Sequence, residues 1–165
     1  MNRLIVFFAA LLLSAAGLAS DTGQRLDYAL FGAAQPIGDG AIDPRPAEGE
    51  TLLLQFWASW CHSCASLMWD MDELVSRNDG VGYVAVSIDD DAEAARDYIR
   101  KHRLYAKYAN RYFVDAGKAL SGSLGVVTVP TILLVNRDGD VLVRKSGHLN
   151  AADYRDFVTA MNGNR

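Results

Sequence analysis

The sequence predicts one α/β domain in which a central mixed β-sheet is flanked by helices. Half of the 165 residues are apolar, which is enough for a single core. From residue 51 onward, compact apolar runs alternate with segments whose apolar residues recur every three or four positions. An Asp-Gly pair between two later apolar runs indicates a hairpin of antiparallel strands. These patterns predict that some neighbouring strands are connected by helices and that two later strands are connected by a short hairpin turn.

The alternation begins with an apolar run at 52–57, which is typical of a strand covered on both faces. Apolar residues within 64–75 then form one stripe of a helix that ends near the break at 78–80. A second buried strand is predicted at 81–88. The three aspartates at 89–91 are N-cap candidates for a helix with Ala95, Tyr98, Ile99 and His102 on one side.

The segment 103–129 is less regular, and we expect a helical or looped connection there. Its aromatic side chains are interpreted as packing residues: Tyr105, Tyr108, Tyr112 and Phe113. Strands at 131–135 and 141–143 should form the hairpin. Asn150 is the expected cap of a last helix with one buried face, formed by Tyr154, Phe157, Val158 and Met161.

Residues 1–19 have the three-part pattern of a secretory signal peptide. Arg3 precedes an apolar run, small residues follow it, and we expect cleavage after Ala19. The alternative is an uncleaved anchor, although the apolar stretch of about 16 residues is shorter than the roughly 20 that span a bilayer. Residues 20–50 predict an N-terminal extension of loops with one or two short strands, and 51–163 predict the folded domain.

The charge distribution argues against nucleic acid as a partner. The formal net charge is −4 and the pI is near 5.3, and removal of Arg3 with the signal would make the charge −5. Lysines and arginines are scattered along the chain rather than gathered in one basic stretch.

The two cysteines of the chain, Cys61 and Cys64, stand in one short motif. Cysteines of exported proteins are usually paired, and a bridge across two residues closes too small a loop to stabilise the fold much. Side chains at i and i+3 of a helix start lie within about 5 to 6 Å, so a disulfide forms there with little backbone movement. The motif therefore predicts a disulfide that opens and closes reversibly.

The two sulfurs should have different roles. Cys61 would face unsatisfied N–H groups and the positive end of the helix dipole, which favour the thiolate, so it is the predicted nucleophile. Cys64, one turn further and more buried, would resolve the mixed disulfide. A zinc site is the alternative, but it needs further ligands and the chain has no second cysteine pair. We expect neither a metal nor a cofactor.

The segment 56–64, Phe-Trp-Ala-Ser-Trp-Cys-x-x-Cys, and the segment 128–131, Thr-Val-Pro-Thr, resemble the thioredoxin superfamily. The resemblance covers most of the chain after the signal. Three features resemble the TlpA/ResA/DsbE-like branch of bacterial extracytoplasmic thioredoxins more than cytosolic thioredoxin. They are the export signal, the Phe-Trp-Ala-Ser-Trp-Cys sequence of the first segment and the Asn-Arg-Asp-Gly-Asp hairpin. The resemblance implies a thioredoxin fold, a periplasmic location and thiol-disulfide oxidoreductase activity on protein substrates.

The resemblance also implies that the Val129-Pro130 bond is cis and that Pro130 lies against the cysteines. Trp60, Val129 and Thr131 would then contact a bound substrate strand. A cis X-Pro bond costs only about 0.5 to 1 kcal/mol, so it can fix a tight bend. From the residues alone, Pro130 reads equally well as a turn proline at the start of a strand.

The sequence departs from thioredoxin at two places. Gln55 stands where thioredoxin has a buried aspartate that helps to deprotonate the resolving cysteine, and a neutral amide cannot accept that proton. TlpA-like proteins often place an acid at the end of the following strand, which points to Asp89 or Asp90. Helix capping is the alternative role for these aspartates.

The second departure is Ser63, where relatives usually have proline. The dipeptide between the cysteines tunes the reduction potential, which ranges from about −270 mV to about −120 mV in such proteins. A protonated His62 would stabilise the Cys61 thiolate and make the disulfide more oxidising, whereas an exposed neutral imidazole would do little.

Three functions compete. The first is a periplasmic reductase, kept reduced by a membrane thiol donor and acting on selected proteins such as apocytochromes. The second is a dithiol oxidase that works with a membrane oxidant. The third is a copper chaperone in which both cysteines and His62 or His148 bind Cu(I). We expect a monomer in each case.

Overall fold

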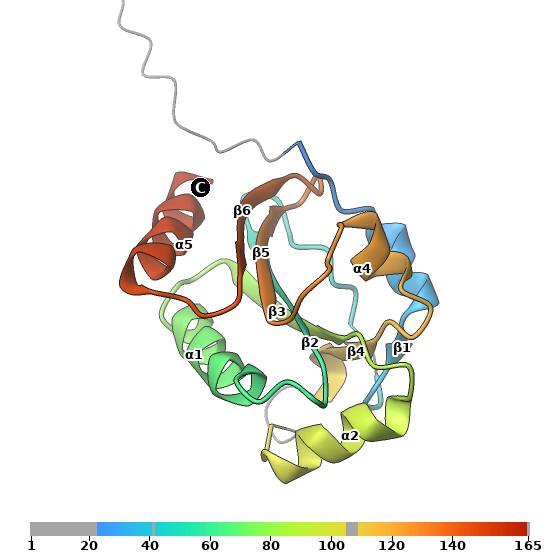
Figure 1. Ribbon diagram of the computed structural model, residues 1–165. Coiled ribbons are helices and arrows are strands. Elements are labelled where there is room, and N and C mark those ends of the chain that lie inside the picture. The colour runs from blue at the N-terminus through green and yellow to red at the C-terminus, as the bar shows by residue number, and fades with distance from the viewer. Residues whose placement is uncertain (1–22, 41, 105–108, 165) are drawn as a thin grey trace, which may run out of the picture.

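A computed structural model describes residues 23–40, 42–104 and 109–164 (Figure 1). The predicted signal peptide, 1–19, lies outside the described residues. Among the helices of the described ranges, none has the length and apolar character of a membrane span.

The centre of the molecule is a mixed sheet of six strands in the order β1-β4-β3-β2-β5-β6 (Figure 1). The β2–β3 and β3–β4 pairs are parallel, and the other pairs are antiparallel. The predicted mixed sheet is therefore confirmed. The strands are β1 (Gln35–Pro36), β2 (Thr51–Trp57), β3 (Val81–Ser87), β4 (Tyr112–Val114), β5 (Thr131–Asn136) and β6 (Val141–Ser146).

The central strand β2 is buried at every position, as its continuous apolar run predicts. It pairs with β3 on one side and with β5 on the other. Side chains alternate between the two faces of a strand, so Leu53, Gln55 and Trp57 share one face. The carboxyl end of β2 leads directly into the cysteine motif.

Helices cover both faces of the sheet (Figure 1). One core cluster lies under α1 (Cys64–Ser76), α2 (Ala92–Lys101) and α5 (Ala151–Gly163) and contains Met68, Ile99 and Phe157. The second lies under the 3-10 helix η1 (Tyr28–Ala33) and α4 (Ala119–Ser123) and contains Phe31 and Leu120. The three longer helices are those that the apolar spacing predicts.

The predicted caps are confirmed in both cases. The Asp91 carboxylate accepts a hydrogen bond from the Glu93 N–H at the start of α2. Asn150 and Asp153 form a reciprocal capping box at the start of α5. These bonds satisfy N–H groups that the first turn of a helix leaves without a partner.

The segment 103–129 differs from the expected helical or looped connection, because it contains β4 as well as the short helices η2 (Ala109–Arg111) and α4. A strand of three residues shows too little alternation to be recognised, and it pairs with β1 from the distant N-terminal extension. Tyr112 and Phe113 are buried, which confirms them as packing residues. Tyr105 and Tyr108 lie outside the described residues.

The predicted hairpin joins β5 to β6 through a turn in which Gly139 has a φ of +94°. A Cβ atom at Gly139 would lie 2.2 Å from the carbonyl oxygen of Leu26, so the turn requires glycine. The N–H of Leu26 donates to the Gly139 carbonyl at 2.7 Å. The N-terminal extension is thereby fixed to the hairpin, and through β1 it also forms an edge of the sheet.

Candidate active site

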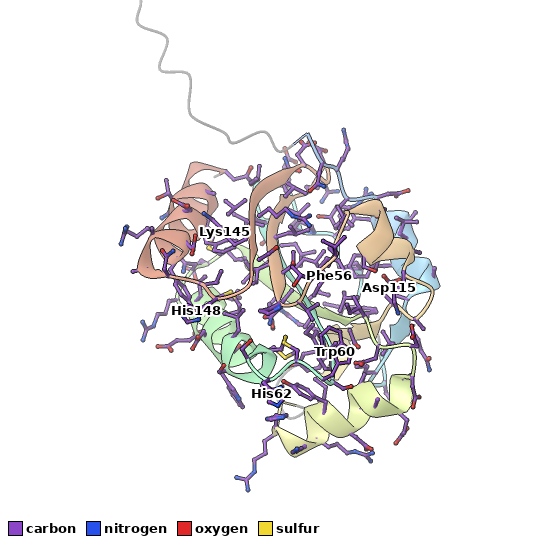
Figure 2. The ribbon with its side chains drawn as sticks, viewed as in Figure 1. Phe56, Trp60, His62, Asp115, Lys145 and His148 are labelled. Atoms are coloured by element: carbon purple, nitrogen blue, oxygen red, sulfur yellow. A yellow bond between two sulfur atoms is a disulfide. The ribbon has the colours of Figure 1, made fainter. Side chains whose placement is uncertain are left out.

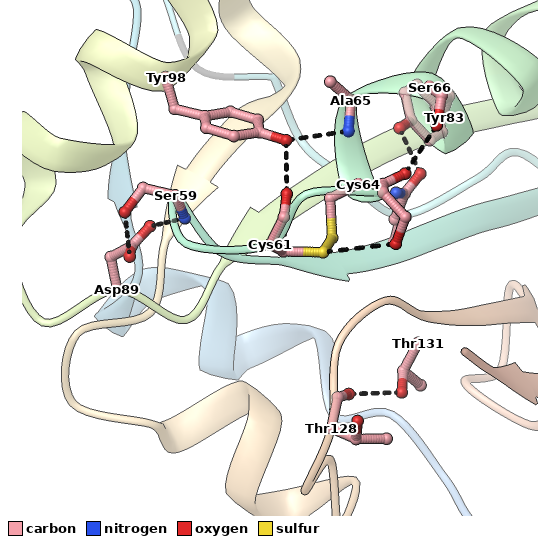
Figure 3. The surroundings of a disulfide bond; sticks show 12 residues. Ser59, Cys61, Cys64, Ala65, Ser66, Tyr83, Asp89, Tyr98, Thr128 and Thr131 are labelled. Atoms are coloured by element: carbon pink, nitrogen blue, oxygen red, sulfur yellow. Dashed lines mark hydrogen bonds between the residues drawn. A yellow bond between two sulfur atoms is a disulfide. The ribbon is translucent and has the colours of Figure 1, made fainter. Parts of the chain in front are cut away.

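Cys61 and Cys64 form a disulfide at the junction of β2 and α1 (Figure 3). The S–S distance is 2.01 Å and the two Cα atoms are 5.5 Å apart. This separation agrees with the distance expected for i and i+3 at a helix start. The redox pair predicted from the spacing is therefore present as a bond.

The two cysteines differ in exposure. Cys64 is 0% exposed, whereas Cys61 is 6% exposed and stands next to the surface residues Trp60 and His62 (Figure 2). Trp60 is 63% exposed, which is unusual for a large apolar side chain. An incoming sulfur therefore reaches the pair from the side of Cys61.

The helix α1 begins at Cys64, so Cys61 and His62 lie in the turn that precedes it. Ser63 occupies the N-cap position, yet its side chain makes no capping hydrogen bond. Its hydroxyl instead lies 4.0 Å from the Cys61 sulfur. In place of the proline usual in relatives, this chain thus has a polar group beside the outer cysteine.

Tyr98 of α2 contacts the backbone of the motif. Its hydroxyl accepts a hydrogen bond from the Ala65 N–H at 3.0 Å and donates one to the Cys61 carbonyl at 2.9 Å (Figure 3). Burial raises the pKa of the Tyr98 phenol, so the group stays protonated and keeps its donor. The apolar stripe of α2 predicts Tyr98 as a packing residue, and nothing in the sequence indicates these contacts.

Asp89 links the end of β3 to the loop before the cysteines (Figure 3). Its carboxylate accepts hydrogen bonds from the Ser59 N–H at 2.9 Å, the Ser59 hydroxyl at 2.8 Å and the Ser87 hydroxyl at 2.6 Å. The Asp90 side chain is 91% exposed and pairs with Lys118. Of the two predicted proton acceptors, the structure brings only Asp89 to the motif.

Gln55 is completely buried on the face of β2 that α1 covers. Its side-chain oxygen accepts a hydrogen bond from the Tyr83 hydroxyl at 2.8 Å. Its amide nitrogen is buried without a hydrogen-bond partner among the described residues. A neutral amide and a phenol thus stand where thioredoxin has its carboxylate.

The Val129-Pro130 peptide bond is cis, as the resemblance implies. Thr131, expected to contact substrate, is instead 0% exposed, and its backbone pairs with β2 and β6. Its hydroxyl donates to the Thr128 carbonyl at 2.8 Å and lies 2.8 Å from the Ser146 hydroxyl. The Thr131 side chain therefore supports the proline loop from inside.

A pocket separates the proline loop from the start of α1. Pro130 and Ser63 lie on its wall, together with residues of α1, of the turn between β6 and α5, and of α5 itself: Ser66, Leu67, Asp70, Gly147, His148, Leu149 and Tyr154. Figure 2 shows His148 on that turn and His62 at the start of α1. The pocket thus brings Ser63 of the cysteine motif, Pro130 and this turn together.

The described ranges contain no group of three or more His, Cys, Asp or Glu side chains that could hold a metal ion. In this structure Cys61 and Cys64 are bonded to each other.

Comparison with known proteins gives consistent relatives. A family model described as thioredoxin-like matches residues 49–141. The thiol-disulfide oxidoreductase ResA of Bacillus thuringiensis subsp. konkukian is 25% identical over 119 residues, which cover 71% of this chain and 66% of ResA. The thiol:disulfide interchange protein DsbE of Vibrio cholerae is 26% identical over 117 residues, which cover 69% of this chain and 59% of DsbE.

Solved structures have the same fold. StoA from Bacillus subtilis superposes with a TM-score of 0.56 at 23% identity, covering 68% of this chain and 85% of StoA. The pneumococcal exposed lipoprotein thioredoxin Etrx1 from Streptococcus pneumoniae gives 0.57 at 20% identity, covering 70% of this chain and 86% of Etrx1. Since the family model matches 93 of the 165 residues, from 49 to 141, this chain belongs to the thioredoxin-like family.

Proposed function

We propose that the protein is a thiol-disulfide oxidoreductase that exchanges disulfides with other proteins through Cys61 and Cys64. The observation that carries this proposal is the disulfide itself, with Cys61 6% exposed beside the surface residues Trp60 and His62 and Cys64 fully buried. The relatives ResA and DsbE, by their names, have thiol-disulfide exchange in common, which supports it.

In the reducing direction, the Cys61 thiolate attacks one sulfur of a partner disulfide. The second partner sulfur leaves as a thiolate and takes up a proton, and a mixed disulfide remains on Cys61. Cys64 then loses its proton and attacks the Cys61 sulfur, which releases the first partner sulfur. The partner gains two thiols and the Cys61–Cys64 disulfide forms; the reverse sequence oxidises a dithiol.

Cys61 is assigned as the nucleophile because it is the sulfur nearer to solvent and precedes the N-terminus of α1. The positive end of the helix dipole stabilises a thiolate at that place. His62 is exposed beside it and adds further stabilisation when it is protonated. Ser63 places a hydroxyl near the same sulfur and tunes its potential.

We assign Asp89 as the acceptor of the Cys64 proton. A carboxylate offers about four lone-pair sites, and three hydrogen bonds occupy Asp89, so one site is left for a proton. In Asp89→Asn the release of partner from the mixed disulfide should slow about a hundred-fold at pH 7. An unchanged release rate in stopped-flow measurements would remove Asp89 from this role.

The substrate is proposed to bind across Trp60 and the proline loop. Trp60 provides exposed apolar surface beside Cys61, and Val129 precedes the cis proline with its side chain partly exposed. Pro130 has no N–H to donate. It lines the same pocket as Ser63, which stands at the start of α1. Thr131 keeps this loop in place through its buried hydroxyl.

For the direction of electron flow, we propose a reductase of the TlpA-like kind. It acts as a monomer in the periplasm, where a membrane thiol donor keeps it reduced and apocytochromes are among its substrates. The predicted signal peptide supports the periplasmic location, and the names of the relatives support thiol-disulfide exchange as such. Equilibration of the Cys61–Cys64 pair with glutathione tests the direction. A reduction potential of about −270 mV indicates a reductase, and one of about −120 mV indicates an oxidase.

Trapping of partners tests the exchange reaction itself. The full-length Cys64→Ser variant, expressed in its native compartment, should accumulate mixed disulfides that reducing agent dissolves. The matched control is the Cys61→Ser, Cys64→Ser double variant, which should trap nothing. If the single variant traps no protein while the wild-type dithiol binds Cu(I) tightly, the chaperone function replaces the one proposed here.

A further inference from the structure

The hydroxyl of Tyr98 lies between two backbone groups of the cysteine motif (Figure 3). It accepts from the N–H of Ala65 at 3.0 Å and donates to the carbonyl of Cys61 at 2.9 Å. Both lengths are those of normal hydrogen bonds. One side-chain atom thus satisfies an N–H of the first turn of α1 and the carbonyl of the outer cysteine.

These two backbone groups would bond to each other in a regular helix. The carbonyl of residue i accepts from the N–H of residue i+4, and Cys61 and Ala65 are four positions apart. The Tyr98 hydroxyl is inserted into that bond. A side chain inserted in this way interrupts the helical ladder, which explains why α1 begins at Cys64 and leaves Cys61 in the preceding turn.

The Tyr98 ring packs against two other rings. Tyr98 is buried, and its ring centroid lies 5.1 Å from that of Trp57 and 4.3 Å from that of His102. Ala95 and Ile99 hold the same face of α2 against the core and are 0% exposed. These contacts and the buried face of α2 hold the hydroxyl at the Cys61 carbonyl.

We propose that Tyr98 is a positioning residue that stabilises the disulfide form of the pair relative to the dithiol form. The bridge is present with the Cys61–Cys64 bond closed. When that bond opens, Cys61 loses its covalent tie to Cys64, and its peptide group can turn toward solvent or toward Ala65. The dithiol form therefore depends less on the hydroxyl. This inference rests on the proposed redox role of the pair.

The equilibrium with glutathione tests the inference on the full-length chain. Tyr98→Phe retains the ring and removes the bridge, so the equilibrium should shift toward the dithiol by five-fold or more; ten-fold corresponds to about 30 mV. The matched control is Tyr28→Phe, which removes a 2.7 Å bond to the Asn136 carbonyl on the other face of the sheet. It should leave the equilibrium within two-fold of wild type.

Urea unfolding of both redox forms separates positioning from a merely structural role. Tyr98→Phe should lower the stability of the disulfide form more than that of the dithiol form. Equal losses, or a shift of less than five-fold with glutathione, would overturn the inference. Because glutathione replaces the protein partner, failure of the trapping experiment would leave this result intact and would concern the proposed function alone.

Discussion

Asp89 shows how single side chains hold the loop that carries the cysteines. Its carboxylate is buried and accepts three hydrogen bonds from two serines, one in the loop and one at the end of β3. Hydrogen bonds to a charged acceptor are worth more than neutral ones. The loop before Cys61 is thus tied to the sheet as well as to α2.

Removal of this carboxylate should destabilise the protein strongly. Asp89→Ala leaves the Ser59 N–H and two hydroxyls without their acceptor, and we expect the free energy of unfolding to fall by about 2 to 3 kcal/mol. Urea denaturation of the oxidised protein measures it. Asp90→Ala, which breaks an exposed ion pair, should cost no more than about 1 kcal/mol. Equal losses in the two variants would contradict this account of Asp89.

The residues of the site differ in how far the sequence reveals them. Cys61 and Cys64 are recognisable because the chemistry lies in a spacing of three residues. Tyr98 is not, because its contacts join residues 33 and 37 positions apart and a tyrosine in an apolar stripe has the same pattern as any packing residue. The burial of the Thr131 side chain is not predicted for a related reason, since it depends on pairing with strands β2 and β6.

Two helices on the same face of the sheet are connected by a polar contact near the pocket. The Tyr154 hydroxyl of α5 donates to the Asp70 carboxylate of α1 at 3.1 Å. Burial and the nearby Asp70 charge raise the pKa of Tyr154 from 10.0 to about 12. The folded protein therefore holds this proton more tightly than the unfolded chain does.

The stability of the wild type should consequently fall between about pH 10 and pH 12. In that window the unfolded chain has lost the Tyr154 proton while the folded protein still binds it, so unfolding releases a proton and becomes easier as the pH rises. Tyr154→Phe lacks this group and should show a shallower fall. Unfolding free energies of both proteins across this range measure the difference; parallel curves would contradict the assigned pKa.

Long and short strands differ in how well the sequence predicts them. The long runs of β2, β3 and β5 are predicted within a residue or two because each is mainly apolar. Strands β1 and β4 are two and three residues long and pair with each other across the chain. Their existence depends on a non-local contact that the local pattern does not contain.

The molecule as a whole has two core clusters, one on each face of the sheet. The N-terminal extension supplies four buried side chains to the second cluster, on the face opposite the cysteines: Leu26, Tyr28, Phe31 and Ala34. Phe31 packs edge-on against Phe113 of β4 with the ring centroids 5.3 Å apart. The extension is therefore part of the folded unit.

Truncation of Phe31 should separate stability from redox chemistry. We expect Phe31→Ala to lower the free energy of unfolding by about 3 to 5 kcal/mol, because it removes a buried ring. The equilibrium of Cys61 and Cys64 with glutathione should remain unchanged, since the pair lies in the other cluster. Leu30→Ala, at a partly buried position beside Phe31, should cost less. A changed redox equilibrium in Phe31→Ala would show that the two faces are coupled.

Measurement of turnover tests the roles of Cys61 and Cys64 most directly. Full-length wild type, supplied with a small dithiol, should reduce many equivalents of a protein disulfide. Cys61→Ser should show no catalysis, and Cys64→Ser should accumulate the mixed disulfide and turn over much more slowly, because only the added dithiol can then resolve it. Sustained turnover by Cys61→Ser, or an undiminished rate in Cys64→Ser, would contradict the assignment of Cys61 as the nucleophile and Cys64 as the resolving cysteine.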